Sequence, residues 1–347
     1  MKKKRIGIIL MVTVMMLGMQ TFAYADDTVP TIDVKNAKVT KHLEMAEGIA
    51  VPDTTINFKI ESKTVDAPKA AIDTITYSDK DEKGELNQGK YTISKEAEIS
   101  FGVFSHAGVY EYTVTEESGT VEGMTYSSES YSLRVYVVNQ EDGTLDIQSI
   151  TAEKDNGKQE EILFTNTYVK NGSLSISKNT VGILADKTKD FEFKIEFIKS
   201  ATESESVTSY EGKIGEESVV CNIGQEQTFS LHDQESLIFE NLPAGTRYVV
   251  TEVGATDGYT PTVNVVENGQ TTVVNKSAAD NQSLVSTDEK ESNLVGEGTN
   301  TVIYTNTYED TPVTGVILEN LPYILLAGMA LLAIVILSVL RSSKKNF

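Results

Sequence analysis

The sequence repeats itself with a period of about 135 to 140 residues. Four short segments recur in the same order at offsets of 135 to 140 residues. In two of these pairs, FTNTY at 164–168 recurs as YTNTY at 304–308, and INFKIE at 56–61 recurs as FEFKIE at 191–196. A constant order at a nearly constant offset indicates a duplicated domain. We therefore predict two domains, at residues 26–168 and 169–310.

Each half carries the signature of β-strands. Hydrophobic and polar residues alternate along 131–137 and 191–197, a period of two that is typical of strands with one buried face. Turn-forming sequences rich in Gly, Asn and Asp separate such runs, as at 141–143, 155–157 and 267–269. These features predict an all-β protein made of two tandem immunoglobulin-like β-sandwich domains. The polar stretch at 277–299 is expected to be a long mobile loop.

Both ends of the chain read as targeting segments. Four basic residues at 2–5 precede an apolar run, and Ala-Tyr-Ala at 23–25 supplies the small residues of a cleavage site, so residues 1–25 are predicted to be a signal peptide. At the other end, residues 323–340 carry no charge and are long enough to span a membrane. The basic tail that follows them is expected to stay in the cytoplasm.

The sequence TPVTG at 311–315 stands just before this span. A pentapeptide, an apolar span and a basic tail in that order resemble a sortase sorting signal, which we assign to residues 311–347. In that family the transpeptidase cuts between threonine and glycine, here Thr314 and Gly315. Thr311 replaces the usual leucine, and an ordinary single-span anchor is the alternative interpretation. The resemblance places the protein in the cell wall of a Gram-positive bacterium.

Composition excludes several classes of function. The net charge is −21, and it becomes more negative once the basic ends are removed, so nucleic-acid binding is not expected. One cysteine and three histidines allow neither an intramolecular disulfide nor a Cys/His metal site. We predict no cofactor and no metal. For Cys221, a thioester with Gln225 or Gln227 is the alternative to an idle buried thiol.

A trio of residue types repeats with the domains. In each half a lysine ends the first strand, a glutamate ends a Tyr-x-Val-x-Glu strand, and an asparagine lies in the last strand. The lysine-to-glutamate spacings are 75 and 74 residues, and the glutamate-to-asparagine spacings are 50 and 54. On neighbouring strands each trio can meet in a core, although any one of these residues alone reads as an ordinary strand position.

With these features the chain resembles the Gram-positive backbone pilins, and it is similar to the two-domain major pilins of streptococci known as T-antigens. In that family each domain forms a spontaneous amide between a lysine and an asparagine, assisted by a buried acid. The resemblance implies two such sets, Lys41, Glu116 and Asn166 in the first domain and Lys178, Glu252 and Asn306 in the second. Lys35 and Lys38 are alternatives to Lys41, and Glu117 is expected to face away from Glu116.

Burial supplies a physical route to this bond. It lowers the pKa of a lysine and raises that of a carboxylic acid, so that both are uncharged near neutral pH. The neutral amine can then attack the carboxamide carbon while the acid donates to the carboxamide oxygen and relays protons until ammonia leaves. The reaction happens once per molecule, so the protein is not predicted to be a turnover enzyme.

Polymerisation requires an exposed lysine that accepts the threonine carbonyl. The tyrosine-proline-lysine motif of the wider family is absent. In the T-antigen type the lysine lies just before the last strand of the first domain, which points to Lys158, with Lys154 as the second candidate. The predicted function is a structural subunit of a pilus shaft, and its partners are a pilus-specific sortase, other copies of itself and minor pilins. The alternatives are a wall-anchored adhesin or minor (basal) pilin that binds a host ligand, and an exported enzyme.

Overall fold

The computed structural model describes residues 37–254, 258–279, 282–288 and 290–308, and all regular elements in these ranges are β-strands. Among the residues described, no helix is long and apolar enough to cross a membrane. The predicted signal peptide and sorting signal, with Thr314 and Gly315, lie outside the described residues.

The first twelve strands form one unit with two five-stranded sheets, ordered β4-β6-β1-β12-β8 and β11-β10-β9-β7-β3, and a small β2-β5 sheet. Its strands are β1 (Lys38–Ala46), β2 (Thr54–Ile56), β3 (Phe58–Ser62), β4 (Ala70–Ile72), β5 (Ile75–Tyr77), β6 (Lys90–Phe101), β7 (Gly108–Glu116), β8 (Met124–Thr125), β9 (Ser130–Asn139), β10 (Leu145–Lys154), β11 (Gly157–Gln159) and β12 (Ile162–Tyr168).

The second unit contains a seven-stranded sheet, ordered β16-β15-β18-β13-β24-β20-β21, and a smaller sheet ordered β17-β14-β19-β22, with β23 also paired to β19. Its strands are β13 (Asn171–Val181), β14 (Phe191–Ile198), β15 (Ser209–Ile214), β16 (Glu217–Asn222), β17 (Gln227–Leu231), β18 (Ser236–Pro243), β19 (Arg247–Glu252), β20 (Tyr259–Glu267), β21 (Gln270–Ser277), β22 (Leu284–Val285), β23 (Asn293–Leu294) and β24 (Thr301–Tyr308).

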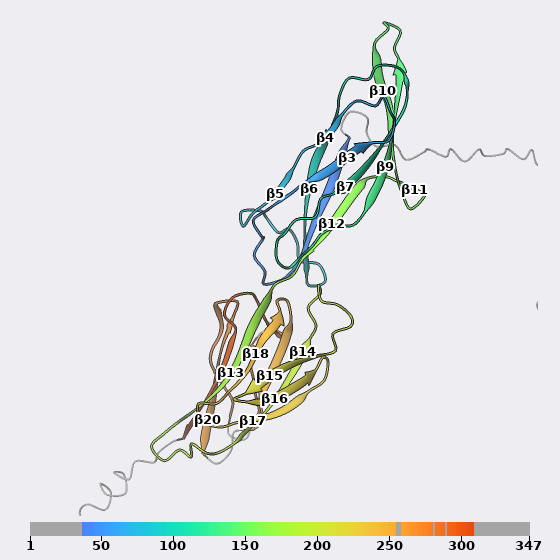
Figure 1. Cartoon of the computed structure of the whole chain (residues 1–347). Coiled ribbons are helices and arrows are strands. Elements are labelled where there is room, and N and C mark those ends of the chain that lie inside the picture. The colour runs from blue at the N-terminus through green and yellow to red at the C-terminus, as the bar shows by residue number, and fades with distance from the viewer. Residues whose placement is uncertain (1–36, 255–257, 280–281, 289, 309–347) are drawn as a thin grey trace, which may run out of the picture.

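Alternating burial builds the core of each unit. Along β9 and β14 every second side chain is buried and the residues between them face outward. The inward side chains of the two facing sheets form one apolar cluster per unit, with Leu43, Phe164, Tyr112 and Leu133 among its members in the first. The prediction of an all-β, sandwich-type fold is confirmed. Figure 1 shows the two units joined end to end.

The first and last strands of each unit lie side by side and run parallel. β1 pairs with β12 and β13 pairs with β24. The two units differ beyond the glutamate-bearing strand. In the first unit only the two-residue β8 crosses to the other sheet and pairs with β12, and β9 then returns to pair with β7. In the second unit the long β20 crosses to the other sheet and pairs with β24 along its length. As a result β20 covers the outer edge of β24, while β8 covers only Thr167 and Tyr168 of β12.

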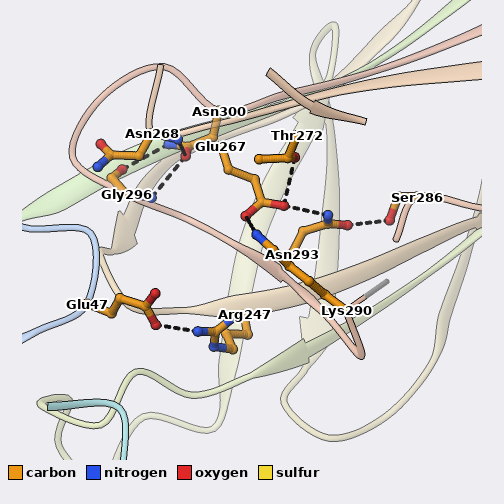
Figure 2. Close-up of polar contacts among 10 residues, drawn as sticks. All are labelled: Glu47, Arg247, Glu267, Asn268, Thr272, Ser286, Lys290, Asn293, Gly296 and Asn300. Atoms are coloured by element: carbon orange, nitrogen blue, oxygen red, sulfur yellow. Dashed lines mark hydrogen bonds and ion pairs between the residues drawn. The ribbon is translucent and has the colours of Figure 1, made fainter. Parts of the chain in front are cut away.

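The expectation of a mobile loop at 277–299 is wrong for the described part of that stretch. β22 and β23 pair with β19, and Leu284, Ser286, Asn293 and Val295 are buried. Polar residues can be buried in this segment because they satisfy one another. The buried Glu267 carboxylate accepts hydrogen bonds from Asn293 at 2.8 Å and from Thr272 at 3.0 Å. Figure 2 shows this network. Composition alone could not distinguish satisfied buried polar groups from solvated ones.

The same segment contacts the first unit. Its Glu297 accepts a hydrogen bond from the Ala50 N–H at 3.0 Å and lies 3.0 Å from Lys170 Nζ. Beside it, Arg247 forms an ion pair with Glu47 (Figure 2). A side chain at Gly48, whose φ is +83°, would meet the Gly296 Cα at 2.9 Å. The two units therefore meet with backbones in direct contact.

Candidate functional site

The lysine and asparagine of the first trio lie on adjacent parallel strands. Lys41 on β1 is opposite Phe164 on β12, and Leu43 is opposite Asn166. Asn166 thus lies two residues beyond the position on β12 that pairs with Lys41. Side chains two residues apart share a face of the sheet, so both point into the core, where neither is accessible to solvent.

The glutamate of this trio comes from the opposite sheet. Glu116 ends β7, and its carboxyl group reaches across the sandwich between the other two side chains. Glu116 Oε2 lies 2.8 Å from Lys41 Nζ, and Asn166 Nδ2 donates a hydrogen bond to Glu116 Oε1 at 2.5 Å. One carboxyl group therefore touches both the amine of Lys41 and the carboxamide nitrogen of Asn166.

This contact differs in one respect from the sequence prediction. The carboxyl was expected to donate to the carboxamide oxygen, but it faces the carboxamide nitrogen. Lys35 lies outside the described residues, and Lys38 is partly exposed and forms an ion pair with Glu96. Glu117 is exposed, as alternation requires. Among the described lysines near this position, Lys41 alone reaches the core.

The second trio repeats this arrangement. Lys178 on β13 is opposite Tyr304 on β24, and Thr180 is opposite Asn306, which is the register seen in the first unit. Glu252 ends β19 in the facing sheet. Its Oε1 accepts hydrogen bonds from Lys178 Nζ at 2.8 Å and from Asn306 Nδ2 at 2.7 Å. All three side chains are fully buried.

Burial moves both amines toward the neutral form. Loss of solvent lowers the pKa of Lys41 to about 8, with Glu116 opposing the change. Burial likewise lowers the pKa of Lys178 to about 8 against the opposing effect of Glu252. The face of the Phe191 ring lies 4.2 Å from Lys178 Nζ. A lysine with such a pKa has a substantial uncharged population at mildly alkaline pH and can act as a nucleophile.

An aromatic pair beside each trio was missed at the sequence level. Phe58 is the strand partner of Glu116, and its ring centroid lies 5.6 Å from that of Phe164. Phe193 is the partner of Glu252, and its centroid lies 5.2 Å from that of Tyr304. Phe58 and Phe193 are equivalent positions in the repeated segments 56–61 and 191–196. The repeat therefore carried a signal for a shared apolar environment around each acid.

A third group of the same residue types provides a contrast. Glu267 lies 3.1 Å from Lys290 Nζ and accepts a hydrogen bond from Asn293 Nδ2 at 2.8 Å. Here the Lys290 side chain is 54% exposed, and hydrogen bonds together with Lys290 keep the pKa of Glu267 below its ordinary value despite burial. A charged acid beside a solvated ammonium forms an ion pair and lacks the neutral nucleophile.

Lys158 and Lys154 lie on one short hairpin. Asp155 and Asn156 both have positive φ, as the two central residues of a type I′ turn require, and β11 carries Lys158 back along β10. Both lysines line a cavity of about 620 Å³ at the outer edge of β12, beside Leu163 and Thr165.

The environments of these two amines differ. Lys154 Nζ lies 3.1 Å from Glu129, and this hydrogen-bonded contact raises the pKa of Lys154. The Lys158 side chain is exposed and makes no hydrogen bond or ion pair within the described residues. Lys158 is therefore the more available amine of the two.

Cys221 has the environment of an inert thiol. It is free and fully buried, and burial raises its pKa to about 11. A reactive cysteine needs a lowered pKa and access to solvent, so nothing around Cys221 favours the thioester alternative. Across the described ranges, no three His, Cys, Asp or Glu side chains are grouped in a way that could hold a metal.

Comparison with known proteins identifies the family. The "Pilin" of Streptococcus pyogenes serotype M1 is 30% identical over 312 residues, which cover 84% of this chain and 86% of that protein. The chain belongs to the pilin family. Residues 37–169 match a family described as a Spy0128-like isopeptide containing domain, and residues 172–308 match a domain of unknown function, DUF7601.

Two further similarities lie within the same group. The "Pilus tip adhesin Cpa" of Streptococcus pyogenes is 44% identical over 91 residues, which are 26% of this chain and 13% of the adhesin. The crystal structure of the major pilin from Streptococcus pyogenes is 27% identical, with a TM-score of 0.38, and the alignment covers 79% of this chain and 98% of that chain.

Proposed function

We propose that this chain is the structural backbone subunit of a covalently polymerised pilus on the surface of a Gram-positive cell. Membership of the pilin family supports this function. The observation that carries it within the molecule is the pair of buried trios, in which the same side chains meet in the same register in both units.

The reaction proposed at each trio is an amide exchange. The neutral lysine Nζ attacks the asparagine Cγ, the carboxyl group accepts a proton from the amine, and the same group returns a proton to the departing nitrogen. A Cγ–Nζ bond forms, the Cγ–Nδ2 bond breaks and ammonia leaves. Rigid strands hold the reacting groups together, which replaces the need for an external catalyst. Each chain reacts once per unit and is its own substrate.

These bonds would join the first strand of each unit to the last. β24 begins next to the junction, where Asn300 donates to the Ser173 carbonyl at 3.0 Å. It ends at Tyr308 beside Gly182, which follows the far end of β13. A bond between Lys178 and Asn306 would transmit tension from β24 directly to β13. The intervening strands of that unit would carry little of the load.

Polymerisation would use the two ends of this rod. In our proposal a sortase cleaves after Thr314 and transfers the threonine carbonyl to Lys158 of another copy. Minor pilins would join the fibre by the same chemistry, and a tip subunit rather than the shaft would bind a host ligand. A wall-anchored adhesin needs the sorting signal but no acceptor lysine.

A gel separates the shaft from the anchored adhesin. Wall extracts from the native host, boiled in detergent and probed for this chain, should contain a ladder of multimers, because amide bonds survive denaturation. A strain without the pilus sortase should release monomer only. Monomer alone in the wild-type extract would contradict the shaft function.

The rate of the internal reaction should depend on pH. Because the pKa of each lysine is lowered to about 8, the neutral amine is depleted as pH falls below that value. We expect bond formation in freshly synthesised protein to slow by up to about tenfold per pH unit between pH 8 and pH 6. The mass of the chain, sampled over time, gives the rate, and a rate that is constant over this range would contradict attack by the free amine.

A further inference from the structure

We propose that the backbone N–H of Ser127 is a catalytic oxyanion donor for the amide bond of the first unit. This inference rests on the cross-link proposed above and adds a group to it that neither the repeat nor the trio contains. The observation behind it is a hydrogen bond of 2.8 Å from Ser127 N to Asn166 Oδ1.

The neighbours of Asn166 fix the orientation of its carboxamide. An amide nitrogen can only donate and its oxygen can only accept. Ser127 presents a backbone N–H, which is a donor, and the Glu116 carboxyl oxygen accepts on the other side. The oxygen must therefore face Ser127 and the nitrogen must face Glu116. Each end of the reacting group has its own partner.

This orientation suits the reaction. When Lys41 Nζ adds to Asn166 Cγ, the carbon–oxygen double bond becomes a single bond and negative charge collects on Oδ1. A donor already in place stabilises that charge without reorganisation. When the Cγ–Nδ2 bond breaks and ammonia leaves, the oxygen regains its double bond and the Ser127 N–H donates to the new amide. Glu116 thus transfers the protons, and the Ser127 N–H stabilises the negative charge on the oxygen.

Local structure holds this N–H in position. Ser127 follows β8, which is hydrogen-bonded to the end of the same β12 strand that carries Asn166. The connection is tight: Val169 N donates to Gly123 O at 2.9 Å. Gly123 has a φ of +81°, and any side chain there would lie 2.1 Å from the Val169 carbonyl. Donor and acceptor are thus tied to one strand, so the donor is preorganised.

The second unit lacks this feature within the residues the structure describes. Asn306 makes the same contact with its glutamate, but its buried Oδ1 has no hydrogen-bond donor there. The counterpart of β8 is the start of β20, where Tyr259 and Thr260 pair with Tyr308 and Thr307 in the register that β8 has with β12, but no described residue of β20 donates to Asn306 Oδ1. The donor belongs to the first unit and is not a general consequence of the repeat.

Replacing one backbone N–H with an ester oxygen tests the proposal. The hydroxy acid with the serine side chain, incorporated at position 127 of the full mature chain, removes the donor and keeps the side chain. The matched control carries the same change at Ser128, whose N–H makes no hydrogen bond within the described residues. After cell-free synthesis, the amounts of the two cross-linked peptides, sampled over time, give the rate of each bond separately. The rate of the second bond serves as an internal reference.

We expect the ester at 127 to slow the first bond by about 100-fold or more, in line with loss of one oxyanion donor. The ester at 128 should leave its rate unchanged, and the second bond should form normally in both. Equal rates at 127 and 128 would overturn the inference. If the first bond is absent even from unmodified protein, the proposed cross-link itself fails, which is a different result.

A measurement on unaltered protein guards against a variant that does not fold. In the mature chain the Ser127 amide should exchange with deuterium far more slowly than the Ser128 amide, although the two are neighbours in an irregular segment. Exchange of both at the same fast rate would show that no carbonyl holds the Ser127 N–H, and the inference would be wrong.

Discussion

Purified mature chain should be lighter than its sequence by the mass of two ammonia molecules. In the proposed reaction each buried trio loses one ammonia when its lysine and asparagine join. Replacing Glu116 by Ala removes the proton relay of the first unit, so this variant should regain the mass of one ammonia. Glu252→Ala should do the same for the second unit only. Intact-mass spectrometry, with digestion to find the joined peptides, distinguishes these three proteins.

Each of these variants should also melt earlier. A cross-link between β1 and β12, or between β13 and β24, closes a loop of about 125 residues, and the entropy model assigns such a closure roughly 4–5 kcal/mol. For units of this size that corresponds to a fall of roughly 10–20 °C in the melting temperature of the affected unit. Calorimetry should show one transition shifted and the other nearly unchanged.

Glu267 offers a matched control. It too is a buried acid that contacts a lysine and an asparagine, but its lysine is solvated. Glu267→Ala should therefore still be lighter than its own sequence by two ammonia molecules, even if it loosens the segment that packs between the units. A chain that had lost three ammonia molecules would mean that exposure of the lysine does not prevent the reaction. A wild-type chain with the full mass of its sequence would show that neither proposed bond forms.

The two trios show how much of the candidate site could be predicted from the sequence repeat. The spacing of Lys41, Glu116 and Asn166 matched that of the second set closely enough to suggest a shared site, because strand alternation fixes which side chains face inward. It could not say that the acid crosses from the opposite sheet. That depends on how the sheets stack, and sequence spacing carries no information about it.

Other features depended on contacts between distant segments. A long alternating strand follows the glutamate in both halves, yet β9 pairs with the glutamate-bearing β7 whereas β20 pairs with β24 in the other sheet. Ser127 gave no signal because its contribution is a backbone N–H, which every non-proline residue has. The stretch at 277–299 was expected to be a mobile loop because polar residues that satisfy one another in a core are compositionally identical to those that face water.

The second large effect concerns assembly. Expressed as the only copy in the native host, Lys158→Arg should give wall-anchored monomer and no ladder. Arginine keeps the positive charge, but its guanidinium stays protonated and cannot attack an acyl intermediate. The hairpin itself should be unaffected, since Lys158 is exposed and has no polar partner within the described residues. Anchoring should persist because it depends on the sorting signal.

Lys154→Arg is the matched control, since it changes the neighbouring amine on the same hairpin and lining the same cavity. Its ion pair with Glu129 can be kept by arginine, and the ladder should remain. If Lys158→Arg left the ladder intact and Lys154→Arg abolished it, the acceptor role would pass to Lys154. Joined peptides from polymer digests would identify the lysine directly.

The geometry explains why this position would yield a fibre. Tyr308 lies at the end of the second unit that faces away from the junction, and Thr314 follows six residues later. Lys158 belongs to β11, which lies in the other unit (Figure 1), so the proposed linkage would join two different surfaces of successive copies. A contact between unlike surfaces repeats without closing unless its rotation forms a ring. A test is to move the acceptor lysine to a position in the second unit, in a Lys158→Arg background. This change should shorten the repeat seen along the fibre or abolish the fibre. An unchanged repeat would mean that the linkage does not set the spacing.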